Sequence, residues 1–107
     1  MPSSQRHNIT AIIYDKKGKI LSIGRNSYCK THPLQAKYAK ESGQPDRCFL
    51  HGEIDAIIRL KYNDKPHKIF VSRVLKNGKY GLAKPCSICE RAIEIAGIKE
   101  VEYTTYD

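Results

Sequence analysis

The sequence predicts an α/β domain with a mixed four-stranded sheet, made of an antiparallel hairpin and two parallel strands late in the chain. Three observations support this fold class. Two apolar segments near the N-terminus flank a short Lys/Gly-rich turn. After residue 50, segments with helical periodicity alternate with segments typical of strands. The length of 107 residues suits one hydrophobic core. We therefore expect a single domain over residues 1–107.

The first two strands are predicted at residues 8–14 and 20–24. The first segment reads Asn-Ile-Thr-Ala-Ile-Ile-Tyr, which is rich in residues that favour strands. The segment between them, Asp15-Lys16-Lys17-Gly18-Lys19, is typical of a hairpin turn. A long polar stretch follows at residues 25–49, with a turn or two of helix expected at residues 34–40. Loops of this length in small domains are usually functional.

Two helices and two more strands are predicted in the second half of the chain. A helix is expected at residues 52–61, where apolar residues recur with helical spacing, and a central strand at residues 68–75. A second helix is expected at residues 86–96, ending at Gly97, and a last strand at residues 101–105. The inward positions predicted for the second helix are Ile88, Ala92, Ile93 and Ile95. Because a helix separates the last two strands, we expect them to be parallel.

The formal net charge of +8 comes from 19 basic and 11 acidic residues. It favours an anionic partner, such as a nucleotide or a polynucleotide. The basic residues are spread along the chain, however, and they serve solubility equally well. No run approaches the roughly 20 apolar residues that a spanning helix needs, and the polar start lacks the apolar segment of a secretory signal. We therefore expect no membrane association and a location in the reducing cytoplasm.

Two short motifs indicate a metal site with a vacant position. They are His51-Gly52-Glu53 and Pro85-Cys86-Ser87-Ile88-Cys89. One imidazole and two thiolates can hold Zn²⁺ while leaving one coordination position for solvent or substrate. Glu53 would then be a nearby carboxylate that transfers protons. Both motifs are expected where a helix begins after a strand, so their side chains should converge at one edge of the sheet.

A closed, structural zinc site is the main alternative. Cys48 and His51 form a Cys-x-x-His pair, which together with Cys86 and Cys89 would supply four ligands. Against this, 34 residues separate His51 from Cys86, more than in typical zinc ribbons. Glu53 would also have no role in such a site. Whether Cys48 fills the fourth position stays open, and a non-catalytic zinc-binding module is the corresponding function.

The two metal motifs resemble those of the zinc-dependent cytidine and deoxycytidylate deaminase superfamily, including its tRNA-adenosine deaminase branch. Residues 81–86 and 96–103 are similar to the same branches. The resemblance implies a three-layer cytidine deaminase-like fold and the hydrolytic deamination of a nucleobase. It also implies that His51, Cys86 and Cys89 hold Zn²⁺ and that Glu53 is the catalytic proton shuttle.

The resemblance also implies several substrate contacts. Gly24-Arg25-Asn26 is similar to a substrate loop in which the Asn contacts the sugar, a role that maps to Asn26. Gly52 stands where these branches commonly have Ala, and its N–H can contact the base carbonyl. Pro85 would stiffen the turn that leads to Cys86. In addition, Arg25 and Arg73, among other cations that flank the predicted crevice, could hold a phosphate, and Tyr103 could stack on a base.

The expected substrate is cytosine in a free (deoxy)nucleotide such as deoxycytidine monophosphate. Single-stranded DNA, RNA or tRNA is the alternative, which the net charge of +8 would suit. The chain stops at Asp107, where relatives continue into a fifth strand and another helix, so we expect a fold truncated at its C-terminus. Members of the superfamily are commonly oligomeric, which implies a homo-oligomer. Cytosine versus adenine, and any allosteric effector, are left open by the sequence.

Overall fold

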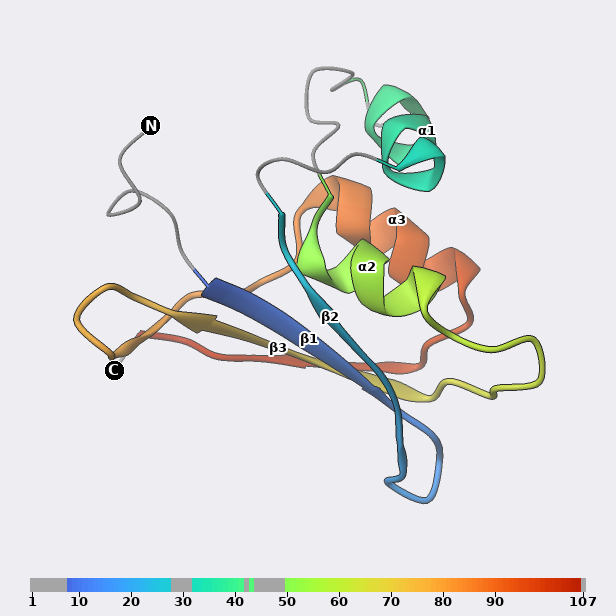
Figure 1. Cartoon of the computed structure of the whole chain (residues 1–107), viewed down its shortest axis with the longest axis horizontal. Helices are drawn as coiled ribbons and strands as arrows, with labels where there is room; N and C mark the ends of the chain where they lie inside the picture. Colours follow the sequence, from blue (N-terminus) through green and yellow to red (C-terminus); the bar gives the residue numbers. More distant parts are fainter. Residues whose placement is uncertain (1–7, 28–31, 42, 44–49, 107) are drawn as a thin grey trace.

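A computed structural model describes residues 8–27, 32–41, 43 and 50–106 of the chain (Figure 1). The fold is α/β, with three helices and an open, mostly antiparallel five-stranded sheet in this part of the chain. The elements in chain order are β1 (Asn8–Tyr14), β2 (Ile20–Arg25), α1 (Pro33–Glu41), α2 (Gly52–Ile58), β3 (Lys68–Val74), β4 (Tyr80–Gly81), α3 (Ser87–Ile95) and β5 (Glu100–Tyr103).

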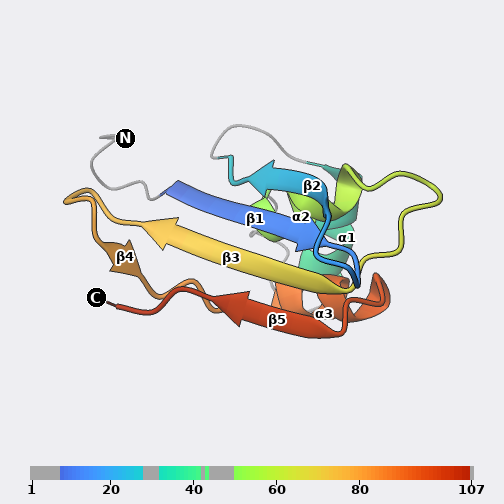
Figure 2. The same ribbon diagram turned by 90° about the horizontal axis from the view of Figure 1, so that it is seen from below.

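Strand β3 is the centre of the sheet. It pairs with β1 antiparallel along its whole length, and β1 in turn pairs antiparallel with β2. On its other side, β3 pairs with β5 in parallel near its start and with β4 antiparallel near its end (Figure 2). The predicted parallel pairing of the long third strand with the last strand is therefore confirmed.

Strand β4 was not predicted, so the described sheet has five strands where four were expected. It has two residues and returns from β3 through a tight turn in which Leu75 N donates to Lys79 O at 2.8 Å. The signal in the sequence is the dipeptide Asn77-Gly78, and Gly78 has φ of 83°. Such dipeptides favour hairpin turns because glycine adopts positive φ without steric cost.

The three described helices lie on the same face of the sheet. Figure 1 shows α1, α2 and α3 together above the strands, and Figure 2 shows the strands in front of them. No helix covers the opposite face among the described residues. The three-layer arrangement implied by the resemblance is therefore not found in this part of the chain, because both predicted helices pack on the same side as α1.

Two apolar clusters lie on the covered side of the sheet. The first contains alternate residues of β1 and β3, including Ile13 and Val71, packed against Ala56 of α2. The second lies among the helices and contains Ile54 and Ile88. Burial follows the strand period of two and the helix period of 3.6. The second cluster also includes a cysteine of α3, so the predicted metal motif is part of the core.

The prediction that Ile95 points inward is wrong. Its relative exposure is 58%. The buried positions of α3 are Ile88, Cys89, Ala92 and Ile93. Successive residues of a helix are 100° apart, so these four side chains form one stripe along α3. Ile95 lies just outside the edge of this stripe. The last turn of α3 therefore presents this side chain to solvent.

Strand β2 lies directly against α2. A Cβ atom at Gly24 would be 2.2 Å from Ala56 N and 2.4 Å from Gly52 O. Ser22 Oγ donates to Ala56 O at 2.8 Å, and Arg25 N donates to Asp55 Oδ2 at 2.9 Å. This contact fixes the position of α2, and the first residues of α2 carry one of the two metal motifs.

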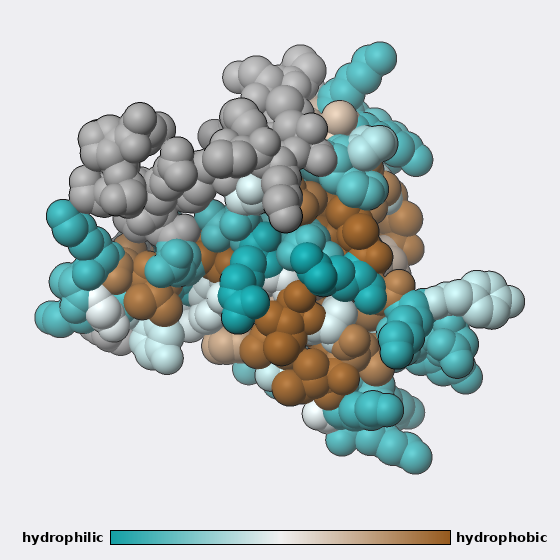
Figure 3. Space-filling model, in the orientation of Figure 1, coloured by the Kyte–Doolittle hydropathy of each residue, from teal (hydrophilic) through white to brown (hydrophobic). Residues whose placement is uncertain are grey.

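Hydrophilic side chains are concentrated on the turn between β1 and β2 and on the loop between α2 and β3 (Figure 3). Apolar surface is visible over β2, which carries the exposed Ile20 and Ile23. None of the described helices has the length and apolar character needed to cross a bilayer.

Candidate metal centre

His51 is held at the start of α2 by its backbone. It is the N-cap residue, with extended backbone angles, and its carbonyl accepts from Asp55 N at 2.9 Å. Its N–H donates to Gln35 Oε1 of α1 at 3.1 Å, and Gln35 is completely buried. The imidazole therefore leaves a backbone that is fixed by two helices.

The two cysteines are placed by the first turn of α3. Cys86 is the N-cap residue, and its carbonyl accepts from Glu90 N at 2.8 Å. Cys89 follows three residues later and is fully buried. Residues three apart lie on the same side of a helical turn, so Cys86 and Cys89 face the same way. The N-cap positions of His51 and Cys86 confirm that both motifs lie where helices begin. Pro85, buried directly before Cys86, restricts φ at this entry.

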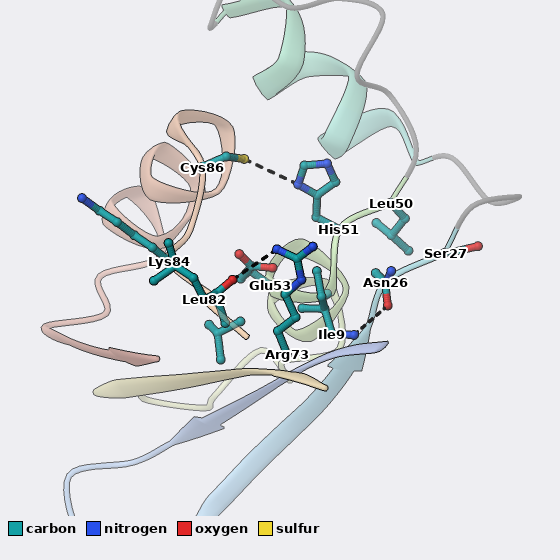
Figure 4. Close-up of a pocket in the computed structure, with 13 residues that line it drawn as sticks. Ile9, Asn26, Ser27, Leu50, His51, Glu53, Arg73, Leu82, Lys84 and Cys86 are labelled. Carbon is teal, nitrogen blue, oxygen red and sulfur yellow. Dashed lines mark hydrogen bonds between the residues drawn. The ribbon is translucent and has the colours of Figure 1, made fainter. Parts of the chain in front are cut away.

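The three side chains meet within metal-binding distance. His51 Nδ1 is 3.2 Å from Cys89 Sγ and 3.6 Å from Cys86 Sγ, a contact visible in Figure 4. All three ligand atoms lie within 4.8 Å of one another. Tetrahedral zinc with bonds of about 2.3 Å to sulfur and about 2.0 Å to nitrogen separates these atoms by roughly 3.6 Å. The cluster could therefore hold a metal ion such as zinc.

The two thiols differ in acidity. A hydrogen bond from Cys89, followed by one from His51, lowers the pKa of Cys86 to about 3. The same hydrogen bond between the two sulfurs, together with burial, raises the pKa of Cys89. Cys86 is therefore the more acidic of the two thiols. A bound cation would displace the protons of both, because thiolates and not thiols are metal ligands.

Glu53 is a buried carboxyl group beside the cluster. Its relative exposure is 6%, and it lies in the first turn of α2. Burial raises the pKa of Glu53, opposed by a hydrogen bond from its own backbone N–H and by the nearby His51. Its carboxylate also forms a hydrogen bond with Cys89. This side chain adjoins the ligand atoms without being needed to complete the three-residue set.

A cavity of about 490 Å³ opens beside the cluster. This volume lies within the range of small-molecule sites. Its walls combine apolar side chains with a few polar groups (Figure 4). The lining residues are Ile9, Asn26, Ser27, Leu50, His51, Gly52, Glu53, Val71, Arg73, Leu82, Ala83, Lys84 and Cys86. Two of the three candidate metal ligands, His51 and Cys86, thus line this cavity together with Glu53, while Cys89 lies buried behind them.

The other predicted substrate contacts are divided between the cavity and its surroundings. Asn26 and Gly52 line it. Asn26 is also part of the fold, since its Oδ1 accepts from Ile9 N at 3.1 Å. Arg25 lines a separate pocket on the β2 side of α2, and Tyr103 lies on β5 outside the cavity lining.

One residue at the site, Gln35, was missed by the sequence reasoning. Gln35 lies in a polar stretch, where nothing distinguishes a buried glutamine from an exposed one. Arg73 was predicted only as one of several cations near the crevice that could hold a phosphate, and the structure places it in the cavity lining. The clue to Arg73 in the sequence is its place in the strand. It follows Ile69 and Val71 at alternate positions on the buried side of β3, where an apolar residue is expected.

Cys48, the alternative ligand, lies outside the described residues. Within the described residues, the group close enough to hold a metal consists of His51, Cys86 and Cys89.

Neither a comparison with models of protein families nor a comparison with curated proteins finds a match for this chain. The assignment of a function therefore depends on the residues and the geometry of the site.

Proposed function

We propose that the protein is a zinc-dependent hydrolase that deaminates a nucleobase. The leading substrate is cytosine in a free (deoxy)nucleotide such as deoxycytidine monophosphate, with uracil and ammonia as products. The observation that carries the proposal is the cluster of His51, Cys86 and Cys89 beside a cavity that is lined by His51, Cys86 and a buried carboxyl group, Glu53.

The donor set fits an open zinc site. Two sulfurs and one imidazole nitrogen are ligands that zinc prefers, and their spacing is compatible with tetrahedral coordination, whose fourth position we assign to solvent or substrate. When bound, zinc supplies a Lewis acid that lowers the pKa of water towards neutrality. A purely structural site would need a fourth protein ligand and would have no use for a buried acid beside it.

Glu53 is placed to move the protons of the reaction. Its carboxylate accepts a proton from water as the oxygen attacks the ring carbon that bears the exocyclic amine. Glu53 then donates this proton to the ring nitrogen, and a second transfer from oxygen to the amine releases ammonia. Burial raises its pKa, so it can hold the proton between the two transfers. Gly52 lines the cavity, and we assign its backbone N–H the role of orienting the base.

The cavity walls support a flat heteroaromatic ligand. Ile9, Leu50, Val71 and Leu82 provide apolar surface, beside polar side chains that include those of Asn26, Glu53 and Arg73. Such a distribution favours a ring bound by apolar contacts and oriented by few hydrogen bonds. A nucleobase has this character.

The proposal is tested by ammonia release from zinc-loaded protein, screened over deoxycytidine monophosphate, other nucleosides and nucleotides, and single-stranded oligomers. We expect Glu53→Gln to keep its zinc and to reduce turnover by about 10²–10⁴-fold, since it removes general acid–base catalysis. Glu94→Gln, a change of the same type on the exposed side of α3, is the matched control and should keep full turnover. Substantial turnover by Glu53→Gln would refute the proposed role.

A base in single-stranded nucleic acid is the second candidate substrate, favoured by the net charge of +8. Polynucleotide binding releases counterions, so its affinity should fall steeply with salt, whereas a mononucleotide should lose affinity only gently. A salt titration of both ligands therefore separates the two candidates.

A further inference from the structure

Arg73 lies at a position of β3 where the alternation of the strand predicts an apolar side chain. It follows Ile69 and Val71 on the helix-covered side of β3, and both of these are buried in the core. Its partner across the sheet is Ile9, another cavity-lining residue. Arg73 is half-buried, and its side chain extends along the wall of the cavity (Figure 4).

The guanidinium of Arg73 lacks an anionic partner within the described part of the chain. Its Nε is buried and has no hydrogen-bond acceptor there. One terminal nitrogen, Nη1, donates to Leu82 O at 3.4 Å, and none of the ion pairs between described residues involves Arg73. Arginine stays charged at all relevant pH values, and a buried donor without an acceptor is unfavourable.

The chain holds Arg73 in this place firmly. Its N–H donates to Thr104 Oγ1 at 3.1 Å, and the same hydroxyl donates to Gly81 O at 2.8 Å. A Cβ atom at Gly81 would be 3.4 Å from Arg73 Cδ, so β4 packs against the stem of the side chain. The backbone and stem are therefore fixed, while the edge of the guanidinium that carries Nε has no acceptor.

We propose that Arg73 binds the terminal phosphate of the substrate and thereby selects a nucleoside monophosphate over a nucleoside. Nη1 donates to the Leu82 carbonyl, so an oxyanion in the cavity approaches from Nη2, and the buried Nε becomes a second donor to the same oxyanion when the side chain turns towards it, in the bidentate geometry that arginine favours. Lys84, the other long cationic side chain in the lining, directs its ammonium away from the cavity (Figure 4). The inference rests on the proposed function for the identity of the base.

The test is a binding measurement on the full chain loaded with zinc, in the Glu53→Gln background so that no turnover occurs. Isothermal titration compares deoxycytidine monophosphate, deoxycytidine and a short single-stranded oligomer that contains one cytosine. We expect the monophosphate to bind on the order of 10- to 100-fold more tightly than the nucleoside, as charge-assisted hydrogen bonds warrant. Arg73→Leu should remove this preference and change the nucleoside affinity by less than about 3-fold.

Two further variants keep the test decisive. Lys76→Gln removes one positive charge from the exposed turn between β3 and β4 and should leave the preference intact. Arg73→Gln serves if Arg73→Leu does not fold, and circular dichroism checks both. Retention of the phosphate preference without Arg73, equal loss for both ligands, or tighter binding of the oligomer than of the monophosphate would each overturn the inference.

The outcomes also separate this inference from the proposed reaction. Arg73-dependent binding of the monophosphate without ammonia release from any base would contradict the reaction and uphold the phosphate site. Ammonia release together with a preference for the monophosphate that does not depend on Arg73 would uphold the reaction and contradict the phosphate site.

Discussion

At the scale of single residues, the candidate ligands of the site are positioned by backbone hydrogen bonds and buried neighbours that are not ligands themselves. The His51 backbone donates to the buried Gln35, and Cys86 begins the helix whose next turn buries Cys89. Metal affinity depends on such support, because groups that orient a ligand affect binding nearly as much as the ligand itself. The chemistry of the site thus requires residues with no reactive group of their own.

Removal of single cysteines distinguishes an open zinc site from a closed one. Cys89→Ser should abolish the binding of one zinc per chain, because serine is a poor zinc ligand at neutral pH. Cys48→Ser should keep one zinc per chain with an affinity changed by less than about 3-fold, since the open site does not use this thiol. Zinc content after dialysis, measured by atomic emission, checks both variants. Loss of zinc from Cys48→Ser would identify a four-ligand structural site.

The support for His51 predicts a smaller effect. Gln35→Leu has a similar volume and removes the acceptor of the His51 N–H. We expect zinc affinity to fall by about 10- to 100-fold, as for other groups that orient ligands, with the helical content unchanged. Competition with a chromophoric chelator measures this. An unchanged affinity would show that α2 alone positions the imidazole.

At the scale of elements, the contact between β2 and α2 sets the position of the site. Gly24 leaves no space for a side chain, because its Cα faces the α2 backbone. Ser22 and Asp55 add hydrogen bonds across the same contact. A shift of α2 would therefore move His51 and Glu53 together relative to α3.

Two glycine substitutions test this contact. Gly24→Ala places a Cβ 2.2 Å from Ala56 N, so α2 must move. We expect a loss of about 3 kcal/mol in the free energy of unfolding, or a chain that does not fold. Gly52→Ala, whose Cβ would be 3.3 Å from Ile9 O, is the matched control and should change stability by less than about 1 kcal/mol. Urea denaturation gives both values, and equal effects would contradict the described packing.

The strands that alternate on one buried face were predictable. Residues 8–14 and 68–75 carry the β1 and β3 signals, and the structure places these strands within a residue of the predicted bounds. The end of α2 was less predictable, since it stops at Ile58 although Leu60 still packs on the core. Apolar periodicity continues there past the last helical residue, so the pattern alone could not locate the end.

The metal motifs were predictable because their chemistry is local. The spacing of Cys86 and Cys89 places both on one helical turn, and the structure brings them to His51. Arg73 and Gln35 were not predictable in the same way. Their burial depends on which strands and helices lie against them, and this is a property of the tertiary arrangement.

At the scale of the whole molecule, the fold has two apolar clusters with different relations to the metal centre. One lies between the sheet and the two helices α2 and α3 and contains none of the candidate ligands. The other lies among α1, α2 and α3 and includes Cys89, with Cys86 packed against it. Metal binding should therefore stabilise the helical layer more than the sheet.

Removal of the metal tests this division. We expect a strong chelator to lower the melting temperature of the protein while most of the far-ultraviolet circular dichroism at 25 °C is retained, because the sheet cluster does not depend on zinc. Hydrogen exchange should speed up mainly in α1 and α3. A structural zinc module would instead unfold on chelation, and loss of the whole signal would favour that class of protein.

The most direct test of the metal centre is zinc K-edge X-ray absorption of the purified full chain. With His51, Cys86 and Cys89 as the protein ligands, we predict two sulfur neighbours at about 2.3 Å and two nitrogen or oxygen neighbours at about 2.0–2.1 Å. Three sulfur neighbours, or a chain that binds no stoichiometric zinc, would contradict the open site and with it the proposed deaminase.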